Sequence, residues 1–269
     1  MKYTIVTTFS ADGYEKYGHR MIDTFLYNWP KEVDLAVFAE GCSVTQESPN
    51  LTVHDLEAAS PSMVLFKQTW GQDPRANGQG PDPSRKDANK AFKWDAVRFC
   101  HKVYAVCAAA EICQSDWLIW MDADTVCHSP ITVEAISQFT PADLDLCFLG
   151  RRQKFSECGL YAMNMTSKVT REFLADFRNY YDNPEDGIFT LDEWHDSFVF
   201  DVVRKRHALR ELDWAGHHMS GEGHPLINSD WGKYLDHLKG DRKLSGKSWN
   251  RDFKVPRNEP YWQNLQRGS

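Results

Sequence analysis

Two aspartates follow directly on a short apolar run. The segment Trp117–Met121 reads WLIWM, and Asp122, Ala123 and Asp124 come next. In an extended chain residues i and i+2 point to the same side, so both carboxylates could be presented together at the exit of a buried strand. Two hard oxygen ligands suit Mg²⁺ or Mn²⁺, which keep positions open for water and substrate phosphates. A divalent ion held there could neutralise a diphosphate leaving group.

An Asp-x-Asp triplet alone carries little information, because a chain of this length contains about one by chance. Asp143-Leu144-Asp145 is a second copy. It precedes an apolar run instead of ending one, which predicts that it lies at the wrong end of a sheet for a ligand crevice. Turn and cap chemistry before Ser129-Pro130 is the structural alternative for Asp122 and Asp124.

A distant segment offers a third metal ligand and a phosphate contact. Residues 236–243 read DHLKGDRK and hold His237, Gly240 and Lys243 in a His-x-x-Gly-x-x-Lys pattern. A neutral imidazole could bind the metal ion. The glycine would let the backbone approach a phosphate closely, and the lysine would act on it as a point charge. An ordinary basic surface loop is the alternative interpretation.

Alternating strand and helix signals must position these side chains. The first is a β-rich run at Tyr3–Phe9, followed by helical spacing over Glu15–Trp29, which Pro30 ends. Apolar runs at Val33–Phe38 and Leu51–Leu56 continue the rhythm. Such a βαβ pattern predicts a largely parallel sheet covered by helices, with a ligand crevice at the carboxyl ends of its strands. The further expected strands are Trp117–Met121, Leu144–Leu149 and Gly159–Met165, and the further expected helices are Lys86–Ile112, Thr170–Tyr181 and Glu193–Lys205.

Residues 71–85, GQDPRANGQGPDPSR, are rich in Gly, Pro, Asn and Asp, which predicts a long loop. An ordered lid over the site and a disordered insertion are both compatible with this composition.

The amino-acid composition favours some classes of protein and counts against others. The 269 residues carry Lys+Arg 31 against Asp+Glu 38, a net charge of −7, and 42% are hydrophobic, enough for a real core. The acidic balance counts against a large nucleic-acid interface and a polybasic membrane anchor. No apolar run approaches the length of a transmembrane segment, and the apolar stretch at the start of the sequence is too short for a signal-peptide core. Seven cysteines without a C-x-x-C pair favour a reducing compartment, so a cytoplasmic location is expected.

The order of these motifs resembles that of the metal-dependent nucleotide-sugar glycosyltransferases of the type A fold (GT-A), in particular the glycogenin and lipopolysaccharide galactosyltransferase group. The resemblance covers roughly residues 3–248. It implies an α/β fold with a mixed, mostly parallel central sheet flanked by helices in one domain, 1–269. Within it, 1–125 would bind the nucleotide sugar, 126–250 would form the acceptor side and 251–269 a tail.

The resemblance also implies roles for individual residues. Asp122, Asp124 and His237 would hold Mn²⁺ or Mg²⁺, and Lys243 would face the diphosphate. Tyr14 and Tyr17 compete for stacking on the uridine, and either Arg98 or Lys102 would hold the donor sugar and diphosphate. Asp196 is the first candidate at the reaction centre, with His195 second; an N-capped helix start is the alternative role for Asp196. The remaining residues expected to bind the donor are Thr7, Thr8, Ala123, Glu157 and Gly240.

Two further groups of residues stay open. His217, His218 and His224 could form a second metal site, an acceptor loop or a solvent-facing cluster. The aromatic residues Trp231, Trp249, Tyr261 and Trp262 could stack on sugars or simply pack.

The expected activity is transfer of a sugar from a nucleoside diphosphate sugar, with uridine as the expected nucleoside, to a glycan, lipid-linked sugar or protein. The resemblance favours retention of anomeric configuration; in an inverting enzyme Asp196 would be the general base. A nucleotidyltransferase or phosphohydrolase could use the same carboxylates but would release pyrophosphate or phosphate. A non-catalytic sugar-binding module would not need the His-x-x-Gly-x-x-Lys segment.

Overall fold

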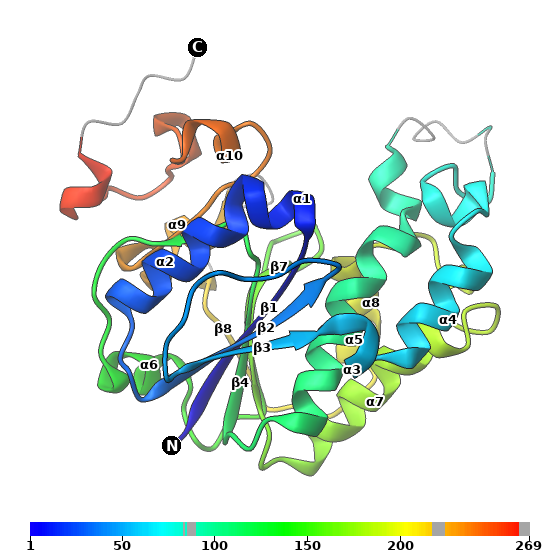
Figure 1. Ribbon diagram of the computed structural model, residues 1–269, viewed down its shortest axis with the longest axis horizontal. Helices are drawn as coiled ribbons and strands as arrows, with labels where there is room; N and C mark the ends of the chain where they lie inside the picture. The colour runs from blue at the N-terminus through cyan, green and yellow to red at the C-terminus, as the bar shows by residue number, and fades with distance from the viewer. Residues whose placement is uncertain (83, 85–89, 217–223, 264–269) are drawn as a thin grey trace.

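A seven-stranded sheet with helices on both faces forms the body of the protein (Figure 1). The computed structural model describes residues 1–82, 84, 90–216 and 224–263. The strand order is β3-β2-β1-β4-β7-β6-β8, and a separate ribbon pairs β5 with β9. The strands are β1 (Tyr3–Ser10), β2 (Val33–Glu40), β3 (Leu51–Asp55), β4 (Trp117–Met121), β5 (Thr125–Cys127), β6 (Leu146–Leu149), β7 (Glu157–Asn164), β8 (Glu211–Asp213) and β9 (Leu235–His237).

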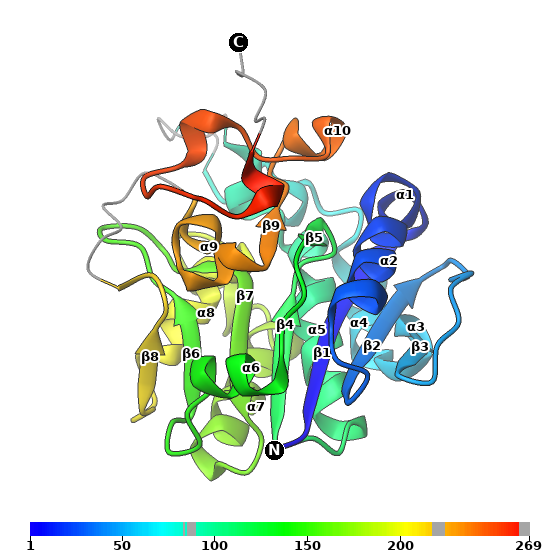
Figure 2. The same ribbon diagram turned by 90° about the vertical axis from the view of Figure 1, so that its left-hand side faces the viewer.

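The large sheet is mixed and mostly parallel. β1 pairs in parallel with β2 and β4, β2 with β3, and β6 with β8, whereas β7 runs antiparallel to both of its neighbours. The expected fold class is therefore confirmed. β1, β4 and β6 all end at the same edge, which is the upper edge in Figure 2.

Alternate residues of the central strands point to opposite faces of the sheet and belong to two separate cores. Val6, Leu118 and Trp120 belong to the core on the side of α5 (Ala96–Ile112). Ile5, Ile119 and Met121 belong to the core on the other side. A strand buried on both faces needs an uninterrupted apolar run, which explains why residues 117–121 carry no polar side chain.

Helices cover both faces of the sheet (Figure 1). On one face lie α4 (Pro61–Trp70), α5, α7 (Lys168–Asp182) and α8 (Asp196–Arg204), and on the other lie α2 (His19–Asn28), α6 (Val133–Phe139) and α9 (Pro225–Asn228). The shorter helical segments are α1 (Ala11–Gly13), α3 (Leu56–Ala59), α10 (Arg242–Ser245), the π-turn Tyr14–Gly18 and the 3₁₀ turns Pro74–Asn77, Ala91–Trp94, Ile188–Thr190, Asp230–Lys233, Asn250–Asp252 and Pro260–Trp262.

The helix expected over Lys86–Ile112 begins later than predicted. The side chain of Asp95 accepts a hydrogen bond from the backbone N–H of Arg98 and caps α5, so the regular helix starts at Ala96. A 3₁₀ turn precedes the cap and leaves Phe92 49% exposed. Residues 86–89 lie outside the described part of the chain.

The described residues of the 71–85 loop are partly regular. Asp73 caps the turn Pro74–Asn77, and the backbone N–H of Gly78 donates to the carbonyl oxygen of Trp94 at 3.3 Å. This segment packs beside the start of α5 and contributes no described residue to the main cavity.

The second Asp-x-Asp copy lies at the opposite edge from Asp122, as predicted. Asp145 immediately precedes β6, and its carboxylate accepts hydrogen bonds from the backbone N–H and the guanidinium of Arg210. Arg210 lowers the pKa of Asp145 to about 2. The pair joins β6 to the segment before β8, so its role is structural.

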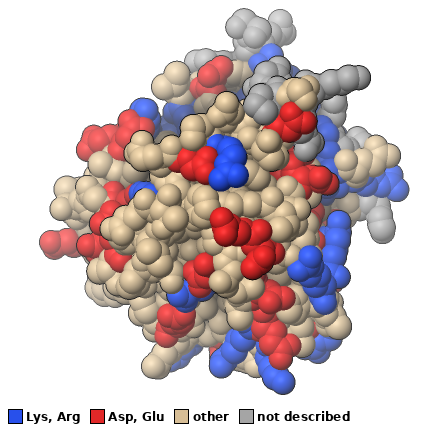
Figure 3. Space-filling model, turned by 90° about the vertical axis from the view of Figure 1, so that its right-hand side faces the viewer, with Lys and Arg blue, Asp and Glu red and all other residues tan. Residues whose placement is uncertain are grey.

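No described helix is both long and apolar enough to cross a membrane. On the face drawn in Figure 3, acidic and basic side chains are interspersed over largely uncharged surface. The described part of that face therefore lacks the continuous basic area that long nucleic acids bind.

We expect Leu118→Ala to lower the free energy of unfolding by about 2–5 kcal/mol, because Leu118 is fully buried in β4 and its truncation leaves a cavity. Leu65→Ala in α4 is the matched control. Leu65 is 65% exposed, so its change should stay within about 0.5 kcal/mol. Urea unfolding of both variants checks the assignment of the core; equal losses would contradict it.

Candidate active site

A large cavity lies at the carboxyl edge of the sheet. Its volume is about 870 Å³, and it is lined from the ends of β1 and β4, the starts of α5, β7 and α8, and the segment after β9. Thus segments from both halves of the chain meet there, with the chain after β9 lying over the edge (Figure 2).

Asp122, Asp124 and His237 meet at this edge. Asp122 follows β4, and its backbone N–H donates to the carbonyl oxygen of Gly159 at 2.9 Å. The β5–β9 ribbon pairs Thr125 with His237 and so brings the imidazole beside the aspartates. His237 Nε2 lies 3.0 Å from Asp124 Oδ1 and 3.5 Å from Asp122 Oδ2. Each residue offers a ligand atom within 4.8 Å of the other two, a donor set of two carboxylates and one imidazole that fits Mn²⁺ or Mg²⁺.

The charges of this cluster stabilise one another. Burial opposes a charged imidazole, yet the Asp124 carboxylate raises the pKa of His237 above its ordinary value. Burial also opposes the ionised form of Asp124, but His237 and Lys243 hold the pKa of Asp124 well below its usual range.

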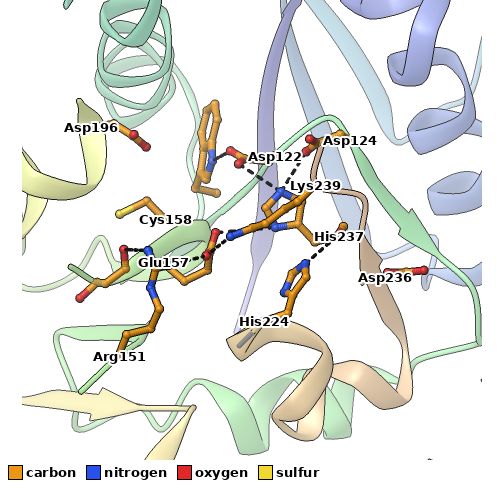
Figure 4. A network of polar contacts seen from close by, with 12 residues as sticks. Asp122, Asp124, Arg151, Glu157, Cys158, Asp196, His224, Asp236, His237 and Lys239 are labelled. Atoms are coloured by element: carbon orange, nitrogen blue, oxygen red, sulfur yellow. Dashed lines mark hydrogen bonds and ion pairs between the residues drawn. The ribbon is translucent and has the colours of Figure 1, made fainter. Parts of the chain in front are cut away.

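The other ring nitrogen of His237 faces Glu157. Nδ1 lies 3.7 Å from Glu157 Oε1 and has no hydrogen-bond partner among the described residues. Glu157 is buried and contacts the ammonium of Lys239, while Arg151 lies 3.8 Å away (Figure 4). Burial raises the pKa of a carboxyl, but Lys239 and His237 hold that of Glu157 well below its usual range. Glu157, which was expected to bind the donor, is thus engaged from three sides by side chains of the protein.

Gly159 makes room for the imidazole. A Cβ atom at this position would overlap Cε1 and Nδ1 of His237. The strand β7 can therefore lie directly against the ring only because residue 159 is a glycine.

Lys243 and Gly240 lie on the loop after β9. The Lys243 ammonium is 2.8 Å from Asp124 Oδ2 and 4.6 Å from the centre of the Tyr17 ring. Gly240 has a φ of 56°, a left-handed conformation that favours glycine, and it lines the cavity.

The two candidate tyrosines have different surroundings. Tyr17 lines the cavity. Tyr14 does not, and its hydroxyl instead bonds to the side chains of Thr45 and Gln46 at 2.8 Å each. Of the two threonines, Thr8 lines the cavity and donates to the carbonyl oxygen of Phe38 at 2.6 Å, whereas Thr7 is fully buried beneath it. Ala123 also lines the cavity.

Lys102 joins three elements from below the cavity. Its ammonium lies 2.8 Å from both Asp122 Oδ1 and Asp196 Oδ2 and donates to the carbonyl oxygen of Cys158. Burial opposes this charge, but the two carboxylates raise the pKa of Lys102 well above its ordinary value. Arg98, one turn earlier in α5, is exposed at the rim, and its guanidinium has no carboxylate partner among the described residues.

Asp196 is the first residue of α8, and His195 is its N-cap. The His195 ring accepts from the N–H of Phe198 at 3.3 Å, and its Nε2 lies 3.0 Å from Glu193. His195 is therefore held by its own segment, while the Asp196 carboxylate is fixed by Lys102. Both line the cavity.

The sequence did not assign Arg151 and Lys239, which hold Glu157. Lys239 lies inside the His-x-x-Gly-x-x-Lys pattern, which could have drawn attention to it, whereas nothing in the sequence marks Arg151. His224 Nε2 bonds to the carbonyl oxygen of His237 at 2.6 Å, which ties it to the backbone of β9. His217 and His218 lie outside the described residues.

The four aromatic residues left open by the sequence are absent from the cavity lining. Trp231 and Trp262 are buried in the core that includes α2. The Trp249 ring lies against the guanidinium groups of Arg242 and Arg251, and the Tyr261 ring stacks on His128 at 4.0 Å. Packing accounts for all four.

No protein-family model and no curated protein matches this chain. Among solved structures it is similar to the bifunctional glycosyltransferase WbbM in apo form, at a TM-score of 0.47 and 11% identity over 78% of this chain and 38% of that one. It is also similar to mouse xyloside xylosyltransferase 1 (TM-score 0.44, 11% identity, 79% of this chain and 85% of that one) and to an active-site mutant of LgtC (0.45, 12%, 78% and 72%). The chain spans 38% of the length of WbbM. The structures to which it is similar thus include glycosyltransferases.

We expect Gly159→Ala to weaken Mn²⁺ binding at least tenfold, because the added methyl group displaces the His237 ring from the two aspartates. Isothermal titration calorimetry with MnCl₂ measures the effect. Gly41→Ala is the control: Gly41 has a φ of 62° and open space around it, so the variant should lose about 1–2 kcal/mol of stability but retain Mn²⁺ binding. Unchanged Mn²⁺ affinity in Gly159→Ala would remove His237 from the ligand set.

Proposed function

We propose that this protein is a metal-dependent glycosyltransferase that uses a nucleoside diphosphate sugar, with uridine as the nucleoside. The proposal rests on one observation: the side chains of Asp122, Asp124, His237 and Lys243 lie close together and line one large cavity. A site for a divalent cation thus adjoins a lysine and a cavity large enough for a nucleotide and a sugar.

Asp122, Asp124 and His237 would hold Mn²⁺ or Mg²⁺. The bound ion would neutralise negative charge on the departing diphosphate. Glu157 would act on His237 from the side opposite the metal. Its carboxylate faces Nδ1 of the imidazole and favours the proton on that nitrogen, so the lone pair of Nε2 would be free for the metal. Glu157 is therefore proposed as a positioning residue.

Lys243 and Arg98, which both line the cavity, would contact the diphosphate. Lys243 is already at the metal site, and Arg98 offers a guanidinium free of any described carboxylate. Fixed cations in a partly enclosed site stabilise developing negative charge without reorganisation during the reaction. Lys102 would act indirectly, because its ammonium is committed to Asp122 and Asp196.

The nucleoside would lie beside β1 and the π-turn that follows it. Tyr17 and Thr8 face the cavity there, so Tyr17 is preferred over Tyr14 for stacking on the base. Thr7 and Tyr14 would support these residues from the core. Gly240 would allow the loop backbone to approach the phosphates.

In the proposed reaction an acceptor hydroxyl oxygen forms a bond to the anomeric carbon while the bond from that carbon to the diphosphate breaks. The hydroxyl proton leaves to the diphosphate or to solvent. Asp196 faces the cavity in an orientation fixed by Lys102, which suits a role in orienting the acceptor or stabilising positive charge on the sugar. That role is compatible with the retention of configuration that the family resemblance favours.

We expect Asp122→Asn and Asp124→Asn each to lower metal-dependent hydrolysis or transfer of the donor at least a hundredfold, because a neutral amide is a weaker ligand for a hard cation. EDTA should have the same effect on the unmodified protein. Asp143→Asn is the matched control, since Asp143 belongs to the second Asp-x-Asp copy and is exposed. Circular dichroism verifies folding, and full activity in EDTA or in either variant would refute the metal assignment.

The class of reaction is tested by its products. With a panel of nucleotide sugars and Mn²⁺, we expect mass spectrometry to detect a nucleoside diphosphate and free or transferred sugar. Pyrophosphate or a nucleoside monophosphate as the product would indicate a nucleotidyltransferase or phosphohydrolase instead. Binding of sugars without any turnover or any requirement for a metal would indicate a sugar-binding module.

A further inference from the structure

A second hollow adjoins the candidate active site. This groove has a volume of about 510 Å³ and lies between residues 150–156, which connect β6 to β7, and the end of α8. Its lining shares Arg151, Lys154 and Phe155 with the main cavity. A molecule in the groove would therefore reach into the site where the donor sugar is expected.

The groove is basic although the chain as a whole is acidic. Among the residues lining it, five are Lys or Arg and two are Asp, whereas the chain carries a net charge of −7. The two aspartates are already used. Asp201 accepts from the N–H and hydroxyl of Ser156 and from Arg204, and Asp213 accepts from the N–H groups of Gly150 and Ala215.

Three of the cations have no such partner. Arg204 pairs with Asp201 and Glu211, and Arg151 bonds to the carbonyl oxygen of Phe155 at 2.8 Å. Arg152, Lys154 and Lys205 are exposed and make no ion pair or side-chain hydrogen bond with a described residue. Three unpaired cations around one concave surface attract anions from solution and bind them at short range.

The connecting loop is shaped to present these side chains. Gln153 has a φ of 60°, an unfavourable conformation for a residue other than glycine. The loop is fastened at its base by the bonds from Ser156 to Asp201 and from Arg151 to the Phe155 carbonyl oxygen. The strained turn thus projects Arg152 and Lys154 from a fixed base.

Resting on the proposed function, we infer that the groove is the acceptor site and that the acceptor is an anionic sugar, bearing a carboxylate or a phosphate. The donor side of the cavity has its own cations in Lys243 and Arg98, whereas Arg152 and Lys205 line only the groove. The anionic group would bind Arg152 and Lys205, and Lys154 would bridge the groove and the reaction centre. A neutral acceptor would leave these cations without a role.

The test compares charged and neutral sugars of matched size. Trigalacturonic acid is compared with maltotriose for a carboxylate, and trehalose 6-phosphate with trehalose for a phosphate. Binding is measured by saturation-transfer NMR and calorimetry at low ionic strength, in the presence of UDP and Mn²⁺ so that the donor site is filled. The variants are R152Q/K205Q and, as a matched control, K31Q/K168Q, which removes two exposed lysines at the opposite end of the sheet.

We expect at least one anionic sugar to bind tenfold or more tightly than its neutral counterpart. R152Q/K205Q should lose this preference, while K31Q/K168Q should keep it to within twofold. The arm that binds distinguishes a carboxylate from a phosphate. Equal binding of charged and neutral sugars, no binding of either anion, or an unchanged preference in R152Q/K205Q would each overturn the inference.

Donor hydrolysis separates this inference from the function on which it rests. R152Q/K205Q should hydrolyse the donor with Mn²⁺ at the rate of the unmodified protein, because neither residue lines the main cavity. If the unmodified protein hydrolyses its donor but shows no preference for anions, only the acceptor assignment fails. If no nucleotide sugar is hydrolysed or bound, the proposed function itself fails.

Discussion

The buried ammonium of Lys102 holds the two sides of the candidate site together. From α5 it contacts Asp122 after β4, the carbonyl oxygen of Cys158 in β7 and Asp196 at the start of α8. Without this charge, two carboxylates would face each other in a partly desolvated space. Removing one member of a buried ion pair costs roughly 3–5 kcal/mol, so the relative placement of these elements depends on this residue. The Trp120 ring, 5.1 Å from the ammonium, adds a cation–π contact.

A similar arrangement operates behind the candidate metal ligands. Glu157 faces His237 on one side and is held by Lys239 and Arg151 on the others. In both places the partners come from segments far apart in the sequence. Asp122 and Asp196 flank Lys102. Arg151 and Lys239 flank Glu157. Asp122 is therefore positioned by Lys102, which also pairs with Asp196, and His237 is positioned by Glu157, which also pairs with Lys239. These second partners restrict the rotation of the candidate ligands and favour a preorganised site.

Much of the sheet could be predicted from the sequence because its signals are local. The run at 117–121 is apolar at every position and is followed by aspartate, so the strand and its position before Asp122 could be predicted. The two carboxylates converge for another reason than the extended geometry assumed for them, because the chain turns after β4 and the N–H of Thr125 donates to the carbonyl oxygen of Asp122 at 3.0 Å. The pairing of His237 with Thr125 could not be derived in this way, since strands of three residues leave no periodic pattern. Only the motif order suggested that His237 belongs with the aspartates.

The remaining differences come from tertiary contacts. Tyr14 and Tyr17 were equivalent in the sequence, and the choice between them depends on Thr45 and Gln46, which lie in a segment without a recognisable pattern. The late start of α5 reflects the cap at Asp95, because the side chain of Asp95 accepts from the N–H of Arg98 and so begins the regular helix at Ala96. The choice between Lys102 and Arg98 also depends on tertiary contacts, because only the folded chain shows that Lys102 is buried and Arg98 exposed.

The short β5–β9 ribbon has a consequence for how the chain can vary in length. The ribbon is fastened to α2, where Asn28 donates to the carbonyl oxygen of Cys127 at 2.6 Å and Thr24 accepts from its N–H at 3.1 Å. The same helix continues from the turn that carries Tyr17. Deleting one residue within α2 would rotate everything beyond it by about 100°, which would separate Tyr17 from the ribbon that bears His237. The interval between Tyr17 and Asn28 should therefore tolerate substitution at its exposed positions but not insertion or deletion, whereas the irregular segment after β2 should accept changes in length beyond Thr45 and Gln46, which hold Tyr14.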